Sequence, residues 1–220
     1  MTAQSERDAW LNVVIPAELD AHMAAVGQAR TNADIVRRMF RLFPLGSGAK
    51  LLVHGCGSCQ MFDFIGLPEL GPVEIVFADL SPAMLGEARK RLERAGGEAC
   101  NLVLDDIEHT GLAGPFDAAL LVLVLLHVDW KCALENIARL QARRLYVIEQ
   151  EQAPGVSPVT MKERLLPSME KYNAVSAMNL VPHRDLEGFL GARGFDLHWA
   201  GMFPVPGDKA MMGSVFQEKE

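Results

Sequence analysis

The sequence predicts an α/β fold in which a parallel sheet carries an antiparallel hairpin at its C-terminal edge. Short apolar stretches alternate with helical patterns over residues 50–150, which is typical of parallel strands joined by crossover helices. The stretch 116–123 is apolar on both faces, as expected of a strand at the centre of such a sheet. Two strand-like stretches, 195–203 and 210–216, lie so close in sequence that they should pair antiparallel.

The composition agrees with one large globular domain. The chain has 220 residues, 50% of them hydrophobic and 22% charged, and a net charge of −7. Such an acidic chain is unsuited to binding nucleic acid or an anionic membrane through bulk electrostatics. Four cysteines are too few for a disulfide framework, and the N-terminus lacks the pattern of a secretory leader. We therefore expect a soluble, cytoplasmic protein with reduced thiols and neither a nucleic-acid nor a membrane partner.

The elements follow in order from the N-terminus. Apolar residues recur at helical spacing over residues 17–43, with a break near Gly27, and a glycine-containing loop over 44–48 follows. Ser81 and Pro82 mark the start of a helix, because serine caps helices and proline fits their first position. Strands are expected at 50–54, 73–78, 99–104, 116–123 and 144–149, and helices at 81–95 and 130–140.

Beyond residue 150 the alternation of strands and helices ends. A helix over 158–172 contains Pro167, which predicts a kink or two short pieces. A second helix over 183–193 is ended by Gly194. The insert 153–181 is long for a connection between a strand and a helix, and long insertions at a functional edge often act as lids.

Three consecutive strand ends carry residues suited to a nucleotide-like ligand. Gly55 and Gly57 form a turn between the first strand and an expected helix, where glycine lets the backbone approach a ligand closely. Asp79 ends the second strand about twenty residues later, where such folds place an acid for ribose hydroxyls. Asp106 follows the third strand and can accept a hydrogen bond from the exocyclic amine of adenine. Each acid alone is more often a helix cap or a solvated turn, but the combination indicates a site.

Here the chain resembles the class I S-adenosylmethionine-dependent methyltransferases over residues 50–220. LLVHGCGSC is similar to the first motif of that family, FADLSPAMLGEAR to the second and LDDIEHTGLAGPFDAAL to the third. LVLVLLHVDW and LYVIEQ resemble the ends of its fourth and fifth strands. The resemblance implies a Rossmann-like seven-stranded sheet in the order 3-2-1-4-5-7-6, with the last strand antiparallel and helices on both faces.

The resemblance also implies S-adenosylmethionine as cofactor and a small molecule as the methyl acceptor. The cofactor-binding residues that it implies are Gly55, Cys56, Gly57, Asp79, Leu80, Met84, Asp106, Ile107, Val122 and Leu123. The chain is expected to form one domain, 1–220, made of an N-terminal helical cap (1–48), the cofactor-binding core (49–152), the lid insert (153–181) and a C-terminal helix and hairpin (182–220).

Three positions depart from the family pattern. Val53 replaces the usual acid near the end of the first strand, so recognition of the methionine amino group is in question. Cys59 stands where the first motif usually has its third glycine. Leu126 replaces the first histidine of a frequent Leu-His-His ending. These departures are compatible with a weakened or specialised site, and that alternative stays open.

Candidates for a base that removes a proton from the acceptor lie after the fourth and fifth strands. They are His127, Glu149 and, as a further candidate, Glu151; the first two are each as often structural as catalytic. The acceptor pocket is expected between the N-terminal helices and the methionine-containing insert, which favours an apolar or aromatic small molecule. No acid pattern for a metal follows these strands, so no metal is expected.

Other readings of the same residues stay open. A nicotinamide-dependent oxidoreductase also uses a glycine turn and a later acid, but Cys59 replaces its third glycine and no Tyr-x-x-x-Lys pair is present. Cys56 and Cys59 form a C-x-x-C that would suit a redox pair or half of a zinc site. A protein of this fold that binds cofactor or a partner without turnover is the third alternative, and a homodimer is left open.

Overall fold

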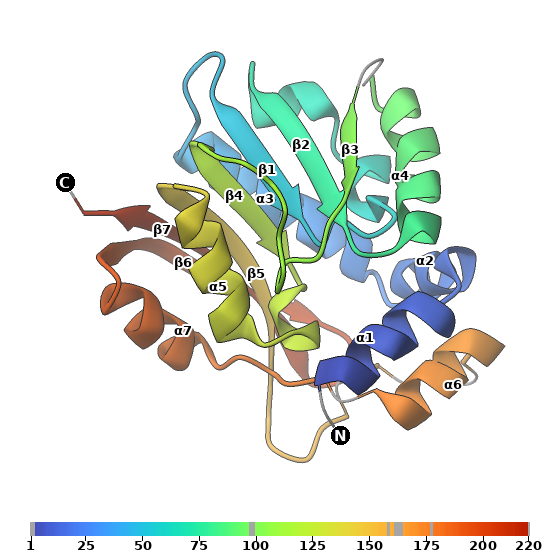
Figure 1. Cartoon of the computed structure of the whole chain (residues 1–220). Helices are drawn as coiled ribbons and strands as arrows, with labels where there is room; N and C mark the ends of the chain where they lie inside the picture. Colours follow the sequence, from blue (N-terminus) through green and yellow to red (C-terminus); the bar gives the residue numbers. More distant parts are fainter. Residues whose placement is uncertain (1–2, 97–99, 158, 161–164, 177, 220) are drawn as a thin grey trace.

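The structure is a computed structural model that describes residues 3–96, 100–157, 159–160, 165–176 and 178–219 (Figure 1). Its centre is a seven-stranded sheet in the order β3-β2-β1-β4-β5-β7-β6. The strands are β1 (Lys50–His54), β2 (Glu74–Asp79), β3 (Asn101–Leu104), β4 (Ala118–Val122), β5 (Arg144–Gln152), β6 (Phe195–Val205) and β7 (Lys209–Glu218). β1 to β5 run parallel, and β7 pairs antiparallel with β5 and with β6. The predicted fold class and strand order are therefore confirmed.

Helices cover both faces of the sheet. They are α1 (Ala3–Asn12), α2 (Pro16–Ala25), α3 (Gln28–Leu42), α4 (Pro82–Arg94), α5 (Trp130–Arg139), α6 (Pro167–Val175) and α7 (His183–Gly191). One apolar cluster joins α3 and α4 to the sheet, and a second joins α5 and α7 to its other face. Side chains alternate along the strands, so Tyr146 and Ile148 of β5 face the first cluster while Leu145 and Val147 face the second.

A third, smaller apolar cluster holds together the helices α1, α2 and α6, which form a cap at one edge of the molecule. It joins α1 to α6 and includes Ala9, Met84 and Tyr172. Figure 1 shows α1, α2 and α6 grouped beyond the ends of β1 and β2. These are the carboxyl ends of the strands, where parallel α/β sheets bind their ligands. The cap thus covers the edge at which the sequence places its candidate site.

One local prediction is wrong, and another is answered only for its second half. The helix expected directly after the glycine turn is a single 3-10 turn, η1 (Gln60–Asp63), because Cys59 before it has a left-handed backbone with φ 57°. Of the two alternatives at Pro167, the structure shows no kink: Pro167 begins α6, as a helix in two pieces requires, since its fixed φ and missing N–H suit the first turn. Residues 158 and 161–164, the first part of the helix expected there, lie outside the described residues.

The break expected near Gly27 is confirmed. Gly27 has φ 74° and separates α2 from α3, so the helical region expected over residues 17–43 consists of two helices, as the predicted break requires. The final two strands are each longer than the sequence indicates, and their pairing carries one register shift between Leu197 and Trp199.

Candidate active site

A cavity of about 230 Å³ lies at the carboxyl ends of β1 to β4, under the cap. Most of the predicted site residues line it: Gly55, Cys56, Gly57, Asp79, Leu80, Asp106, Ile107, Val122, Leu123 and His127. Side chains from α1, α2, α3 and α6 close the other side, among them Trp10, Met23, Asn32 and Met169. The topology therefore brings residues from well-separated motifs to one site.

The glycine turn folds tightly against the end of β4. Gly55 has φ 67°, and a Cβ atom placed on it would lie 2.3 Å from Cγ2 of Val124. Gly57 also has a positive φ, 53°, and its N–H donates to Oδ2 of Asp79 at 2.7 Å. A side chain at position 55 would collide with Val124, so glycine is required there for packing as well as for conformation.

Asp79 is a buried carboxylate at the floor of the cavity, with 2% of the residue exposed. Its oxygens accept from the backbone N–H groups of Gly57 and Ser81, the latter at 2.9 Å. Burial raises the pKa of Asp79 above its ordinary value, and these two backbone donors oppose the shift. A carboxylate oxygen can accept more than one hydrogen bond, so Asp79 keeps acceptor capacity for a ligand.

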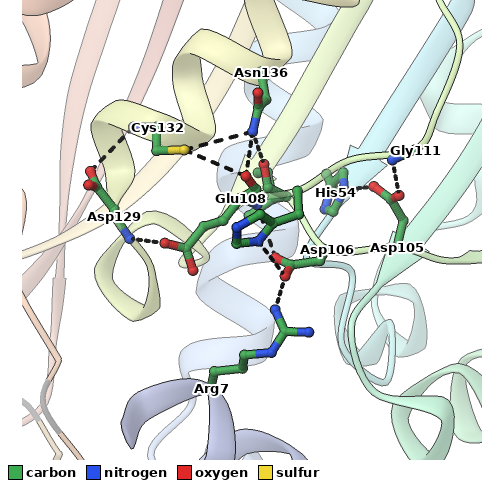
Figure 2. A network of polar contacts seen from close by, with 11 residues as sticks. Arg7, His54, Asp105, Asp106, Glu108, Gly111, Asp129, Cys132 and Asn136 are labelled. Atoms are coloured by element: carbon green, nitrogen blue, oxygen red, sulfur yellow. Dashed lines mark hydrogen bonds and ion pairs between the residues drawn. The ribbon is translucent and has the colours of Figure 1, made fainter. Parts of the chain in front are cut away.

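Asp106 is paired with a cation from the cap. Figure 2 shows Arg7 reaching from α1 to the Asp106 carboxylate, with which it forms an ion pair. The second oxygen of Asp106 accepts from the N–H of Glu108 at 3.0 Å. Arg7 therefore binds the carboxylate that, by the family resemblance, would accept a hydrogen bond from the adenine amine.

A buried pair that the sequence did not reveal lies beside the glycine turn. Nε2 of His54 lies 2.8 Å from Oδ2 of Asp105, whose other oxygen accepts from Gly111 N–H at 2.8 Å (Figure 2). Burial acts to raise the pKa of Asp105, but hydrogen bonds from His54, Thr110 and Gly111 outweigh it and hold that pKa below its usual value. A histidine directly before the turn and an Asp-Asp doublet were the only sequence signals.

The loop after β3 is fastened to α5. Nδ2 of Asn136 donates to the carbonyls of Ile107 and Glu108, each at 2.9 Å, and the Asp129 N–H donates to the Glu108 carboxylate at 3.1 Å (Figure 2). These contacts fix the backbone next to Asp106, and so they hold one wall of the cavity in place.

His127 belongs to a cluster that the sequence did not indicate. Its Nδ1 lies 2.9 Å from Oε1 of Glu6 and 2.9 Å from the hydroxyl of Tyr172. The Tyr172 hydroxyl donates to the same Glu6 oxygen, and Ser176 Oγ donates to the other at 3.0 Å. Burial, followed by the negative charge of Glu6, raises the pKa of Tyr172, which keeps the phenol protonated. Glu6 lies in no recognisable motif, so nothing in the sequence pointed to it.

Two predicted site residues do not line the cavity. Met84 is fully buried in the cap cluster with Ala9 and Tyr172. Glu149 is buried, and neither of its oxygens has a hydrogen-bond partner among the described residues. Burial, reinforced by the charge of Glu151, raises the pKa of Glu149 well above its ordinary value. The next residue along β5, Gln150, is the one that reaches the cavity.

The cysteines of the C-x-x-C are free thiols within the wall of the cavity. A hydrogen bond with Cys59, together with burial, raises the pKa of Cys56 well above its ordinary value, which disfavours the reactive thiolate. In the part of the chain that the structure describes, no three His, Cys, Asp or Glu side chains are grouped so that they could hold a metal ion.

A family profile described as "Methyltransferase domain" matches residues 51–143, which includes the glycine turn, Asp79, Asp106 and His127. The strand order of the sheet and this profile match indicate the same fold. The chain has the class I methyltransferase fold. The family resemblance and fold class indicated by the sequence are thereby confirmed.

Solved structures share this methyltransferase fold at low sequence identity. Magnesium protoporphyrin IX methyltransferase from Synechocystis PCC 6803, with bound SAH, is 19% identical with a TM-score of 0.63, covering 86% of this chain and 83% of that one. N-methyltransferase NodS from Bradyrhizobium japonicum WM9, in complex with SAH, is 13% identical with a TM-score of 0.62, covering 88% of each chain. The [4+2]-cyclase SpnF is 15% identical with a TM-score of 0.62, covering 85% of this chain and 80% of that one.

A comparison with curated proteins finds no match. Among the helices that the structure describes, none combines the length and hydropathy needed to cross a bilayer.

Proposed function

We propose that the protein transfers a methyl group from S-adenosylmethionine to a small-molecule acceptor bound in the cavity. The observation that carries the proposal is the meeting of the glycine turn, Asp79 and Asp106 at one cavity in a sheet of the methyltransferase type. Asp79 would accept from the ribose hydroxyls and Asp106 from the adenine amine. The turn at Gly55 and Gly57 would pass beneath the methionine part.

A buried orphan acceptor supports the fit of this cofactor. Val53 cannot receive the amino group of the methionine part, but Asn32 of α3 lines the same cavity. Asn32 is 4% exposed, and its Oδ1 has no hydrogen-bond partner among the described residues. A buried carbonyl without a partner is costly, and a ligand ammonium group would satisfy it. We propose that Asn32 replaces the missing acid at position 53.

The cavity must enlarge before it can hold both reactants. Its volume of about 230 Å³ lies below the roughly 300–1,000 Å³ of pockets for small ligands. The Arg7 side chain, about one third exposed, lines the cavity next to Asp106, at its border with solvent. Its displacement by adenine would enlarge the site without unfolding the cap.

The remaining lining suits an apolar acceptor. When bound, the cofactor supplies a methyl group already activated by a positively charged sulfur, so the chain has to orient the acceptor and exclude water. The apolar side chains from the cap and the β4 end that line the cavity are Leu19, Met23, Leu126, Val159, Met169 and Met178. Methionine adapts to irregular apolar shapes, which favours a small apolar or aromatic molecule over a macromolecule.

Titration calorimetry with S-adenosylmethionine and S-adenosylhomocysteine tests cofactor binding. Asp79→Ala should weaken binding by roughly 1.5–3 kcal/mol, or about 10–150-fold, because the ribose loses a charged acceptor. Asn32→Leu should weaken binding about tenfold, and Asn32→Asp should retain it because a carboxylate also accepts from an ammonium group. Asp196→Ala is the matched control, since Asp196 is an exposed aspartate on β6. Unchanged affinity in Asp79→Ala would overturn the ribose assignment.

A second candidate function is cofactor binding without methyl transfer. The fold neighbour SpnF is named as a [4+2]-cyclase, so this fold also occurs in a protein named for another reaction, and the departures at Val53 and Leu126 favour the same candidate. Incubation with methyl-labelled S-adenosylmethionine and a panel of phenols, carboxylic acids and amines separates the two. Labelled product supports methyl transfer, whereas tight binding with no label transferred to any member supports the second candidate.

A further inference from the structure

We propose that Glu6 is a positioning residue that presents the Nε2 lone pair of His127 to the acceptor, so that His127 can take a proton from an acceptor hydroxyl. The inference rests on the proposed methyl transfer and adds the class of reacting group. Three elements that are distant in sequence meet to build the arrangement: α1 supplies Glu6, the short helix η3 (Leu125–His127) supplies His127, and α6 supplies Tyr172.

The proton positions follow from the donors and acceptors present. A carboxylate only accepts hydrogen bonds, so the Tyr172 hydroxyl donates its one proton to Oε1 of Glu6. Nδ1 of His127 lies 2.9 Å from that same oxygen and must therefore carry a proton to bond with it. If Nδ1 carried a lone pair instead, that lone pair would face lone pairs on the Glu6 oxygen and on the Tyr172 oxygen. In a neutral imidazole with a proton on Nδ1, the lone pair is on Nε2.

The charge of Glu6 is stabilised although the residue is only 2% exposed. Its oxygens accept from the hydroxyls of Tyr172 and Ser176 and lie beside Nδ1 of His127, and donors that point at a carboxylate favour its charged form. Tyr172 and Ser176 thus hold Glu6, and Glu6 holds the imidazole. The indole of Trp10, with its ring centroid 5.0 Å from that of His127, packs against the ring and limits its rotation.

The free nitrogen of His127 is available to a ligand. The His127 side chain is 20% exposed and lines the cavity. Nε2 has no hydrogen-bond partner among the residues that the structure describes, whereas Nδ1 has two close ones. An unpartnered acceptor nitrogen in a cavity with apolar walls is placed to receive a proton from a ligand.

The step balances as follows. The acceptor O–H bond breaks as Nε2 takes its proton, and the oxygen electron pair forms the new O–CH3 bond. The S–CH3 bond of S-adenosylmethionine breaks with its electrons going to sulfur. The imidazolium is then paired with the Glu6 carboxylate until it releases the proton to water. This device suits an acceptor that carries a proton at neutral pH, such as a hydroxyl on an apolar or aromatic molecule.

The test is the tautomer of His127 in the full-length protein, measured by NMR on histidine labelled with 15N in the imidazole ring. The spectrum of His127→Gln assigns the signal, and the other five histidines serve as internal references. We expect neutral His127 to carry its proton on Nδ1. In Glu6→Gln the amide also donates, so at least about a third of the molecules should carry the proton on Nε2. Tyr172→Phe should leave the Nδ1 tautomer in place, because Glu6 still accepts from it.

The difference between the two variants separates positioning from general packing, since a merely structural role would not change the tautomer in Glu6→Gln alone. A wild-type His127 with its proton on Nε2 overturns the proposal, and so does a tautomer that Glu6→Gln leaves unchanged. The wild-type measurement decides even where a variant fails to fold. S-adenosylhomocysteine titrated into the same samples tests the proposed function separately. Normal binding with the Nε2-protonated tautomer removes only the role of Glu6, whereas absent binding removes the methyl-transfer function itself.

Discussion

At the residue scale, the glycine turn shows two different reasons for a glycine. Gly55 and Gly57 both have positive φ angles, where a side chain costs of order 1–3 kcal/mol. Only Gly55 also lies against a neighbour, because an added Cβ would be 2.3 Å from the branched side chain of Val124. An added Cβ on Gly57 would meet nothing within 4 Å. Comparing the two glycines therefore separates the cost of the backbone conformation from the cost of packing.

The first residue-scale prediction uses this difference. Gly57→Ala should destabilise the fold by about 1–2 kcal/mol, the cost of a left-handed backbone. Gly55→Ala should cost about 2–5 kcal/mol, because the collision with Val124 adds about 1–3 kcal/mol of overpacking. Urea unfolding of the two variants and the wild type measures both free energies. Equal losses would contradict the packing reason for Gly55.

Residues of the site differ in how far the sequence alone could reveal them. Asp79 and Asp106 follow strands within recognisable motifs, and both line the cavity as predicted. Glu6 could not be found, because its partners His127 and Tyr172 lie 121 and 166 residues away in sequence. Periodicity and motif spacing report local structure, whereas such a contact depends on where the cap packs.

At the element scale, α1 connects the cap to the cavity. Its residue Glu6 contacts His127, Arg7 pairs with Asp106, and Ala9 packs in the cap cluster. The helix is ten residues long, and among its side chains at 6–12, which the structure describes, only Glu6 and Ala9 are buried, so it lacks the apolar periodicity by which helices are predicted. The 3-10 turn after Cys59, where a helix was expected, and the start of α6 at Pro167 are likewise set by backbone conformation rather than by apolar pattern.

The prediction at this scale concerns Arg7 of α1 as a competitor of the cofactor. Arg7→Ala should tighten binding of S-adenosylhomocysteine by up to about fivefold, because a partly exposed ion pair worth about 0–1 kcal/mol no longer has to break. Calorimetry at constant ionic strength measures the change. Arg184→Ala is the control, since Arg184 is an exposed arginine on α7. Weaker binding in Arg7→Ala would instead show that Arg7 contacts the cofactor.

At the scale of the whole molecule, the sheet order determines where chemistry can occur. β1 lies between β2 and β4, so the turn after β1 meets Asp79 from one side and the β4 end from the other. This arrangement could be predicted from the sequence, because parallel strands bring their carboxyl ends to one edge and the motifs give their order. The volume of the cavity and the closure by the cap could not, since both depend on side-chain packing between distant segments.

The stability of the whole molecule should depend on the buried carboxyl of Glu149 in β5. Burial raises the pKa of Glu149 in the folded state well above its ordinary value, and its oxygens have no partner among the described residues. Between the ordinary pKa of about 4.3 and the raised one, the folded state binds more protons than the unfolded state, so stability falls as pH rises. Glu149→Gln removes this loss.

We therefore expect the melting temperature of Glu149→Gln to exceed that of the wild type by several degrees at pH 8, and the two to converge toward pH 5. Thermal unfolding followed by circular dichroism across this range measures the difference. Glu187→Gln, a change at an exposed glutamate of α7, should leave the pH dependence of the wild type unaltered. A constant offset between Glu149→Gln and the wild type at every pH would mean that ionisation of Glu149 does not limit stability. The pKa of Glu149 in the folded state would then lie close to its ordinary value.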